Sequence, residues 1–315
     1  MKMKRMLAAG LLGLFTVVAH AQDYPSKPVR ILVPFLAGGD VDIFARLVSE
    51  QWRDSLGQPA IVENRAGGGG LVAFPVLTAA APDGYTVGYF VYTMSQLPAM
   101  FKALPQDWYK QITPITITHT SPVALVGSNK APFKNLAELL RYAKANPGKT
   151  NVGAVGRGLF IDLFQQLAGI ELTQVPYKGA ADLQTAVVAG DIDLAPLSLS
   201  FAKNLQDSGR AVPVVVLTAK RNALLPSVSA AGELVPGYQQ DNWFGFIGPP
   251  GMPKPVVNKI YQATSAALKT PLIQKNIQDN SSEVVNMPPD EMGKFIEEDT
   301  KKWVAVGKRA KIDPQ

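Results

Sequence analysis

The chain has 315 residues, 47% of them hydrophobic and 18% charged, which leaves room for one large domain or two of ordinary size. Its formal net charge is +6, and its lysines and arginines form no basic stripe with interleaved aromatic residues, so nucleic-acid binding is not expected. The absence of cysteine excludes disulfides, a cysteine nucleophile and any metal site that needs a thiolate.

The first 22 residues, MKMKRMLAAGLLGLFTVVAHAQ, have the pattern of a secretory signal. A basic start is followed by an apolar stretch from Met6 to Val18, and small residues stand at Ala19 and Ala21. A membrane anchor is the alternative, but the apolar stretch is shorter than the roughly 20 residues that span a bilayer. We therefore expect cleavage near Ala21, loss of residues 1–21, and a soluble exported protein.

Strand and helix patterns alternate along the chain. The first half predicts strands at 27–35, 58–65 and 85–92, a helix at 40–56, and a glycine-rich stretch at 66–70 that leads into a helical run. The second half predicts strands at 122–128, 172–179, 191–198 and 211–219 and a strand plus glycine loop at 150–158. Its predicted helices lie at 133–149, 159–169, 180–190, 254–268 and 289–310. Such alternation predicts an α/β fold with parallel sheets, and its two strand–glycine–helix units suggest two lobes.

The sequence contains few candidate catalytic residues. His119 is the only histidine outside the signal, and the chain has no G-x-S-x-G motif, so a serine triad is not expected. A lone histidine in a threonine-rich strand is interpreted as structural. Asp40 and Asp42 have no nearby third acid, so no metal site is predicted either.

Two glycine turns precede predicted helices. Gly38-Gly39 stands before the helix at 40–56, and Gly156-Arg157-Gly158 stands before the helix at 159–169. Each turn alone can be nothing more than a tight connection. As a pair, one from each lobe, they can present backbone N–H groups at two helix N-termini and so hold a carboxylate.

Several long segments resemble a known family. They are YPSKPVRILVPFLAGGDVDIFARL, GQPAIVENRAGGGG, VPYKGAADLQTAVVAGDIDL, WFGFIGPPGMPKPVV and KWVAVGKRAKIDP, in this order from Tyr24 to the C-terminus. Together they resemble the tripartite tricarboxylate transporter receptors, the Bug proteins, which are periplasmic solute-binding proteins.

The resemblance implies a type II-like two-lobed fold that closes on its ligand about a hinge of two crossover strands. Residues 22–121 and 235–315 would form one lobe and residues 122–234 the other. The protein would be a periplasmic monomer without cofactor or enzymatic activity, and it would deliver a small carboxylate to a two-subunit permease. A sensor for a membrane kinase and an exported enzyme acting on a carboxylate are the alternatives.

The resemblance also implies which segments contact the ligand, with no catalytic residue and no metal among them. They are the turn after the first strand, the glycine loop of the second lobe, and two strand ends: Phe35, Leu36, Ala37, Gly38, Gly39, Asp40 and Asp42; Gly156, Arg157, Gly158, Leu159 and Phe160; and Tyr177, Leu197 and Ser198.

Three departures from the family pattern concern the ligand. Asp40 replaces a small or hydroxyl residue, Leu159-Phe160 replace Ser/Thr and often a histidine, and Leu197 replaces an aspartate. These changes favour an aromatic or longer-chain acid as the ligand, because they give the cleft an apolar floor. Phe35, Phe74, Tyr92 and Tyr177 can supply further ring faces. In the alternative interpretation, Leu159 and Phe160 merely pack under their helix.

The role of Asp40 is open at this stage. A ligand carboxylate on the Gly38-Gly39 turn would be repelled by a nearby aspartate. Asp40 can avoid this conflict by turning outward to cap the helix, which is the favoured expectation, or by facing the cleft and accepting a donor group of the ligand.

Overall fold

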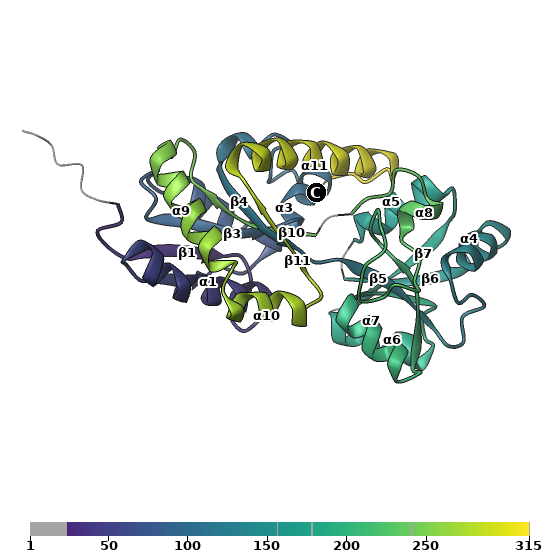
Figure 1. Ribbon diagram of the computed structural model, residues 1–315. Coiled ribbons are helices and arrows are strands. Elements are labelled where there is room, and N and C mark those ends of the chain that lie inside the picture. Colours follow the sequence, from purple (N-terminus) through teal and green to yellow (C-terminus); the bar gives the residue numbers. More distant parts are fainter. Residues whose placement is uncertain (1–23, 156, 178, 241, 315) are drawn as a thin grey trace, which may run out of the picture.

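The structure is a computed structural model that describes residues 24–155, 157–177, 179–240 and 242–314. The predicted signal therefore lies outside the described residues, as does Gly156. Two lobes lie side by side, each built on one β-sheet (Figure 1). We call the part built on the six-stranded sheet lobe 1 and the part built on the five-stranded sheet lobe 2.

The sheet of lobe 1 has the strand order β11-β4-β10-β3-β1-β2. Strands β1, β2 and β3 are parallel, whereas β10 runs antiparallel to both β3 and β4, and β11 runs antiparallel to β4. The strands are β1 (Val29–Val33), β2 (Ala60–Asn64), β3 (Thr86–Val91), β4 (Thr113–Thr120), β10 (Trp243–Gly248) and β11 (Glu283–Met287).

The sheet of lobe 2 has the order β7-β6-β8-β5-β9. Its strands are β5 (Val123–Ser128), β6 (Thr150–Val155), β7 (Leu172–Tyr177), β8 (Leu194–Ser198) and β9 (Ala211–Val216). Strand β6 is parallel to β7 and β8, and β5 is antiparallel to β8 and β9. The expectation of parallel sheets therefore holds only for β1–β3 in lobe 1 and for β6–β8 in lobe 2, and both sheets are mixed. Where the chain first passes from lobe 1 to lobe 2, β4 leads through residues 121–122 directly into β5. Neither strand belongs to a parallel βαβ unit.

Helices cover both faces of the lobe 1 sheet. On one face α1 (Asp40–Leu56), α9 (Lys254–Ala267) and α10 (Pro271–Asp279) bury residues such as Trp52, Ile260 and Ile273 against β1 and β3. The other face carries α2 (Ala73–Thr78), α3 (Thr93–Gln96) and the first half of α11 (Pro289–Arg309). Short 3-10 turns lie at Gly68–Gly70, Leu97–Ala99 and Trp108–Gln111.

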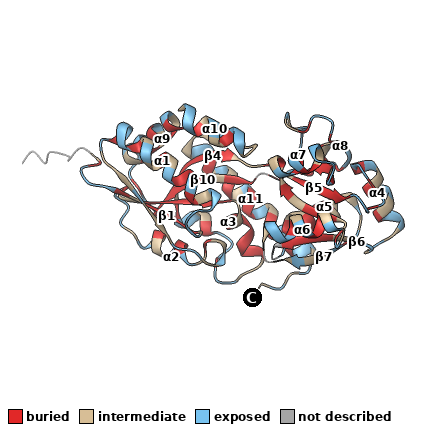
Figure 2. Ribbon diagram, turned by 90° about the horizontal axis from the view of Figure 1, so that it is seen from below, coloured by how far each residue is buried: buried red, intermediate tan, exposed pale blue. Residues whose placement is uncertain are grey.

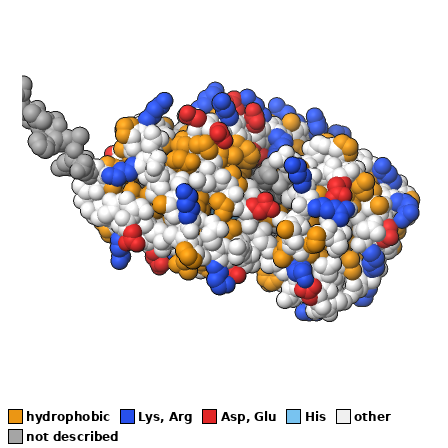
Figure 3. Space-filling view, in the orientation of Figure 1, with side chains coloured by type: hydrophobic (Ala, Val, Ile, Leu, Met, Phe, Trp, Pro, Cys, Tyr) orange, Lys and Arg blue, Asp and Glu red, His pale blue; other side chains and the backbone are white. Residues whose placement is uncertain are grey.

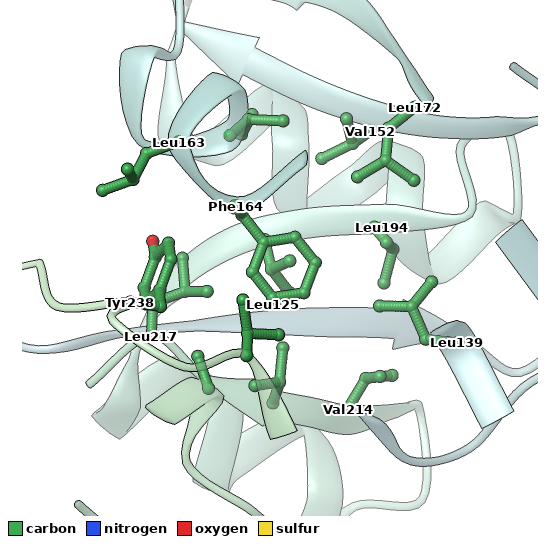
Figure 4. Close-up of a cluster of buried hydrophobic side chains, with 14 of the residues drawn as sticks. Leu125, Leu139, Val152, Leu163, Phe164, Leu172, Leu194, Val214, Leu217 and Tyr238 are labelled. Carbon is green, nitrogen blue, oxygen red and sulfur yellow. The ribbon is translucent and has the colours of Figure 1, made fainter. Parts of the chain in front are cut away.

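Lobe 2 is built in the same way. Helices α4 (Leu136–Ala145), α5 (Leu159–Ala168) and α8 (Ala231–Leu234) enclose one core, centred on Phe164 and Tyr238 (Figure 4). Helices α6 (Ala180–Ala189) and α7 (Leu199–Asp207) enclose the other. Buried residues follow the strands and the inner faces of the helices, and the outer helix faces are exposed (Figure 2).

Helix α11 connects the two lobes. It starts over the lobe 1 sheet and runs toward lobe 2 (Figure 1). Its later residues Trp303 and Val306 belong to the lobe 2 core, and the Gln166 side chain of α5 donates to the Val306 carbonyl at 3.1 Å. The C-terminal helix therefore packs against the sheet of lobe 1 and against α5 of lobe 2.

Candidate functional site

The turn between β1 and α1 is held by a buried carboxylate. Asp42 Oδ2 accepts hydrogen bonds from the Gly38 N–H and from Arg46 Nε, both at 2.9 Å. Its Oδ1 accepts from Asn64 Nδ2 at 2.9 Å, and the same amide donates to the Phe35 carbonyl at 3.0 Å. Because Asn64 ends the neighbouring strand β2, these bonds fix the turn to the sheet.

Burial acts to raise the pKa of the Asp42 carboxyl. The hydrogen bonds from Arg46, Gly38 and Asn64 outweigh this effect, and the net pKa lies below the ordinary value. Asp42 is therefore ionised at neutral pH, with its oxygens already used by the protein. It shapes the turn, and its side chain is not available to a ligand.

Asp40 does not cap helix α1. The N-cap is Gly39, which makes no side-chain capping bond. Asp40 is the first residue of the helix, and its side chain is exposed. The favoured expectation of a capping Asp40 is thus wrong. The N–H groups of Gly39, Asp40 and Val41 have no hydrogen-bond acceptor among the described residues. They form the open N-terminus of α1.

The turn before α5 in lobe 2 is held in a similar way. Asp162, buried in the first turn of α5, accepts from Arg157 through both oxygens, at 2.8 and 3.0 Å. Its Oδ1 also accepts from Gln174 Nε2 at 2.9 Å, and Gln174 lies on the neighbouring strand β7.

Fewer N–H groups are open in this second turn. The Gly158 N–H donates to Gln174 Oε1 at 3.0 Å, and the Leu159 N–H donates to the Arg157 carbonyl at 3.2 Å. The expectation that both glycine turns present several free N–H groups therefore fails for the described part of lobe 2. The protein itself occupies most of that helix N-terminus.

A cavity of about 570 Å³ lies between the lobes, and we call it the α7 cavity. Lobe 1 contributes Asp40 and Phe44 of α1 together with residues of α10, β4 and β10. Lobe 2 contributes Ser198, Ser200, Phe201 and Asn204, along α7, and Arg210 just beyond it. The N–H groups of Leu199, Ser200 and Phe201 at the start of α7 have no acceptor among the described residues.

Four rings from different elements form what we call the aromatic row: Phe44, His119, Phe244 and Tyr92. The His119 ring lies between Phe44, with centroids 4.3 Å apart, and Phe244, at 4.5 Å and nearly parallel. Tyr92 meets Phe244 edge-on at 6.5 Å. Burial lowers the His119 pKa to about 3, so its ring is neutral at pH 7 and serves as an apolar surface. The structural interpretation of His119 agrees with this packing, although the ring also lines the α7 cavity.

A second cavity, of about 520 Å³, adjoins the far end of the aromatic row, and we call it the α11 cavity. Tyr92, Met100 and Phe101 line it from lobe 1, Arg157 and Phe160 from lobe 2, and residues 310–313 from the segment after α11. Phe160 is half-buried, and its carbonyl accepts from the Tyr238 hydroxyl at 3.4 Å.

The structure separates the predicted site residues into groups. Asp40 and Ser198 line the α7 cavity, and Arg157, Gly158 and Phe160 line the α11 cavity. Leu159 and Leu197 are buried in the lobe 2 cores, and Phe74 packs on Trp108 in lobe 1, so these three side chains supply no cleft surface. Tyr177 lines a different hollow, beside Asp182 and Asp191. Phe35 packs against the lobe 1 core, and Leu36–Gly39 are exposed.

Sequence reasoning missed Phe44, Phe244, Arg210 and the residues of α7 and α10. Two signals in the chain could have found those helices. Ser198 is a favourable N-cap residue ahead of α7, and Thr270 followed by Pro271 is a common helix start ahead of α10.

The described residues lack two kinds of feature. They contain no group of three or more His, Cys, Asp or Glu side chains placed to hold a metal ion. No helix in the described ranges is long and apolar enough to cross a membrane. On the face shown in Figure 3, basic and acidic side chains are scattered over both lobes, without a basic stripe.

An α/β molecule of two lobes, with helix N-termini and aromatic rings around a cavity between them, has the construction of a solute-binding receptor. Residues 44–312 match the family model described as the tripartite tricarboxylate transporter family receptor. The chain therefore belongs to this family of periplasmic solute-binding receptors, as its sequence segments predicted.

Known relatives span the whole chain. A UPF0065 protein of Bordetella pertussis is 31% identical, and the alignment covers 99% of this chain and 98% of that protein. The solved periplasmic binding protein BugD is 28% identical with a TM-score of 0.75, covering 93% of this chain and 100% of BugD. The R. palustris protein Rpa4515, solved with adipate, is 28% identical with a TM-score of 0.77 and the same coverage. These structures confirm the predicted two-lobed fold.

Proposed function

We propose that the protein captures a small organic acid between its lobes and delivers it unchanged to a two-subunit membrane permease. The α7 cavity carries this proposal, because both lobes line it and the first residues of α1 and α7 border it from opposite sides. Free N–H groups at a helix N-terminus attract anions through hydrogen bonding and through the helix dipole. The binding of adipate by a relative supports a carboxylate ligand.

The carboxylate would bind the open N-terminus of α1. Gly39, Asp40 and Val41 offer their N–H groups there, whereas the Gly38 N–H is already bound to Asp42. Gly38 has a φ of +84°, a conformation that L side chains rarely adopt, so this turn needs glycine to present its backbone. Arg210 adds a positive charge from the lobe 2 side of the cavity.

The apolar part of the acid would lie over the aromatic row. Phe44, His119 and Phe244 line the α7 cavity, and Tyr92 and Phe160 continue the aromatic lining in the α11 cavity. A ligand long enough to cover this row would be aromatic or would have a longer chain. The segments Phe35–Asp42 and Arg157–Phe160 are the proposed contact regions, with Leu159 and Leu197 limited to backbone contacts.

Other features follow the family and belong to the same proposal. The signal would be removed near Ala21, the mature protein would be a periplasmic monomer, and residues 122–234 would move as one lobe against the rest. No side chain is assigned a catalytic role. Residue pairs such as Asn222 and Glu283, joined at 2.9 Å across the lobes, would rearrange as the lobes move.

Native mass spectrometry of protein isolated from the periplasm without refolding tests this function. The expected result is a released carboxylic acid whose mass stays constant when the pure acid is incubated with the protein. Uptake of that acid should fall in cells lacking the protein. A turnover product would favour an enzyme, and unchanged uptake together with loss of a signalling response would favour a sensor.

A further inference from the structure

The α7 cavity contains two opposite charges that have no partner among the residues that the structure describes. Of the sixteen described residues that line it, only Asp40 and Arg210 are charged at neutral pH, which gives a formal lining charge of 0 (−1 + 1). Both side chains are exposed, and neither makes a hydrogen bond or ion pair with any described residue.

The other acids near the two turns behave differently. Asp42 is bound by Arg46 and Asn64, and Asp162 by Arg157 and Gln174, so each buried carboxylate is satisfied within its own lobe. Asp40 belongs to lobe 1 and Arg210 to lobe 2, and they face one cavity with no partner in the described part of the chain. These two charges therefore remain available to a ligand.

We propose that the ligand is amphoteric: it carries a cationic nitrogen, held by Asp40, as well as the carboxylate. This inference rests on the proposed function and narrows its substrate class. A simple mono- or dicarboxylate on the α1 N-terminus would place like charges side by side and leave Asp40 unpaired. A cationic group beside the carboxylate removes that repulsion and gains a charge-assisted hydrogen bond. Arg210 would then pair with the ligand carboxylate or with a second anionic group when the lobes close.

Four acids of equal chain length test the proposal: hexanoate, adipate, L-2-aminohexanoate and 6-aminohexanoate. They differ only in the presence and place of the nitrogen or of a second carboxylate. Isothermal titration should show that at least one amino acid binds tenfold or more tightly than both hexanoate and adipate. Asp40→Asn should remove most of that advantage and leave hexanoate binding equal or tighter. Asp54→Asn, on the exposed face of the same helix, makes the same chemical change away from the cavity and should preserve the advantage.

Each result distinguishes this inference from the proposed function. If hexanoate or adipate binds as tightly as both amino acids, or if Asp40→Asn preserves their advantage, the amphoteric ligand is wrong while the carboxylate receptor stands. If none of the four binds, the compound released from periplasmic protein decides: a nitrogen-free acid overturns the inference, and an acid with a cationic nitrogen supports it. If none of the four acids binds and no acid is released from the periplasmic protein, the proposed function is overturned as well.

Discussion

Asp42 in the first turn of α1 and Asp162 in the first turn of α5 have matching side-chain partners in the two lobes. Each carboxylate binds an arginine and accepts from an amide side chain on the neighbouring parallel strand, Asn64 for Asp42 and Gln174 for Asp162. The two turns differ in what remains free. Asp42 takes only the Gly38 N–H and leaves the α1 N-terminus open, whereas Gln174 and the Arg157 carbonyl occupy two N–H groups of the α5 turn.

We expect Asp42→Ala to destabilise the protein by about 1–3 kcal/mol, because the Gly38 N–H and the Asn64 amide lose a buried acceptor. Arg46→Ala should cost less, since the exposed arginine is one of three donors and the other two remain. Chemical denaturation measures both values. Asp54→Ala is the surface control and should change the free energy of unfolding by less than about 0.5 kcal/mol. An equal cost for Asp42 and Asp54 would show that Asp42 does not hold the turn.

His119 should make stability depend on pH below neutrality. Its folded pKa of about 3 lies below the ordinary value of 6.5, so between these values the unfolded state binds more protons and stability falls as pH falls. From pH 7 to pH 5 this group alone should lower the free energy of unfolding by about 2 kcal/mol. His119→Phe keeps a ring between Phe44 and Phe244 and should flatten this part of the profile. An unchanged slope in the variant would mean that His119 is accessible and titrates normally in the folded state.

Substitutions of the adjacent residues Leu159 and Phe160 should affect different properties, protein stability for Leu159 and ligand affinity for Phe160. Leu159 is fully buried, so Leu159→Ala should destabilise the protein by about 2–5 kcal/mol. Phe160 lines the α11 cavity, so Phe160→Ala should lower affinity for aromatic or long-chain acids by ~2–4 kcal/mol if its ring is covered like a core aromatic. Affinity for a short dicarboxylate should change much less. Equal losses for both ligand types would remove Phe160 from the selectivity surface.

The sequence predicted those elements whose signals are local. Helix α1 was predicted at its observed bounds, because apolar residues recur on one helical face from Phe44 to Leu56. The two glycine turns and the family segments also indicated the class of receptor. Asp42 was placed near the ligand, but its role in holding the turn depends on Asn64, a partner 22 residues away.

The remaining features depend on contacts between distant segments. The antiparallel strands β4, β5 and β10 follow from the passage of the chain between lobes, which periodicity does not record. Helices α7 and α10 bury only a few residues each, so their apolar patterns are short. Because these helices line the α7 cavity, missing them also concealed Arg210 and its place beside Asp40 in the lining of one cavity.

Small-angle scattering with and without the ligand tests the central claim, that an acid is captured between two lobes that close on it. The acid recovered from the periplasmic protein is added to ligand-free protein, and saturation is confirmed by titration. The account predicts a smaller radius of gyration for the saturated protein, because residues of both lobes must approach across the α7 cavity. An identical radius of gyration at confirmed saturation would contradict capture by lobe closure.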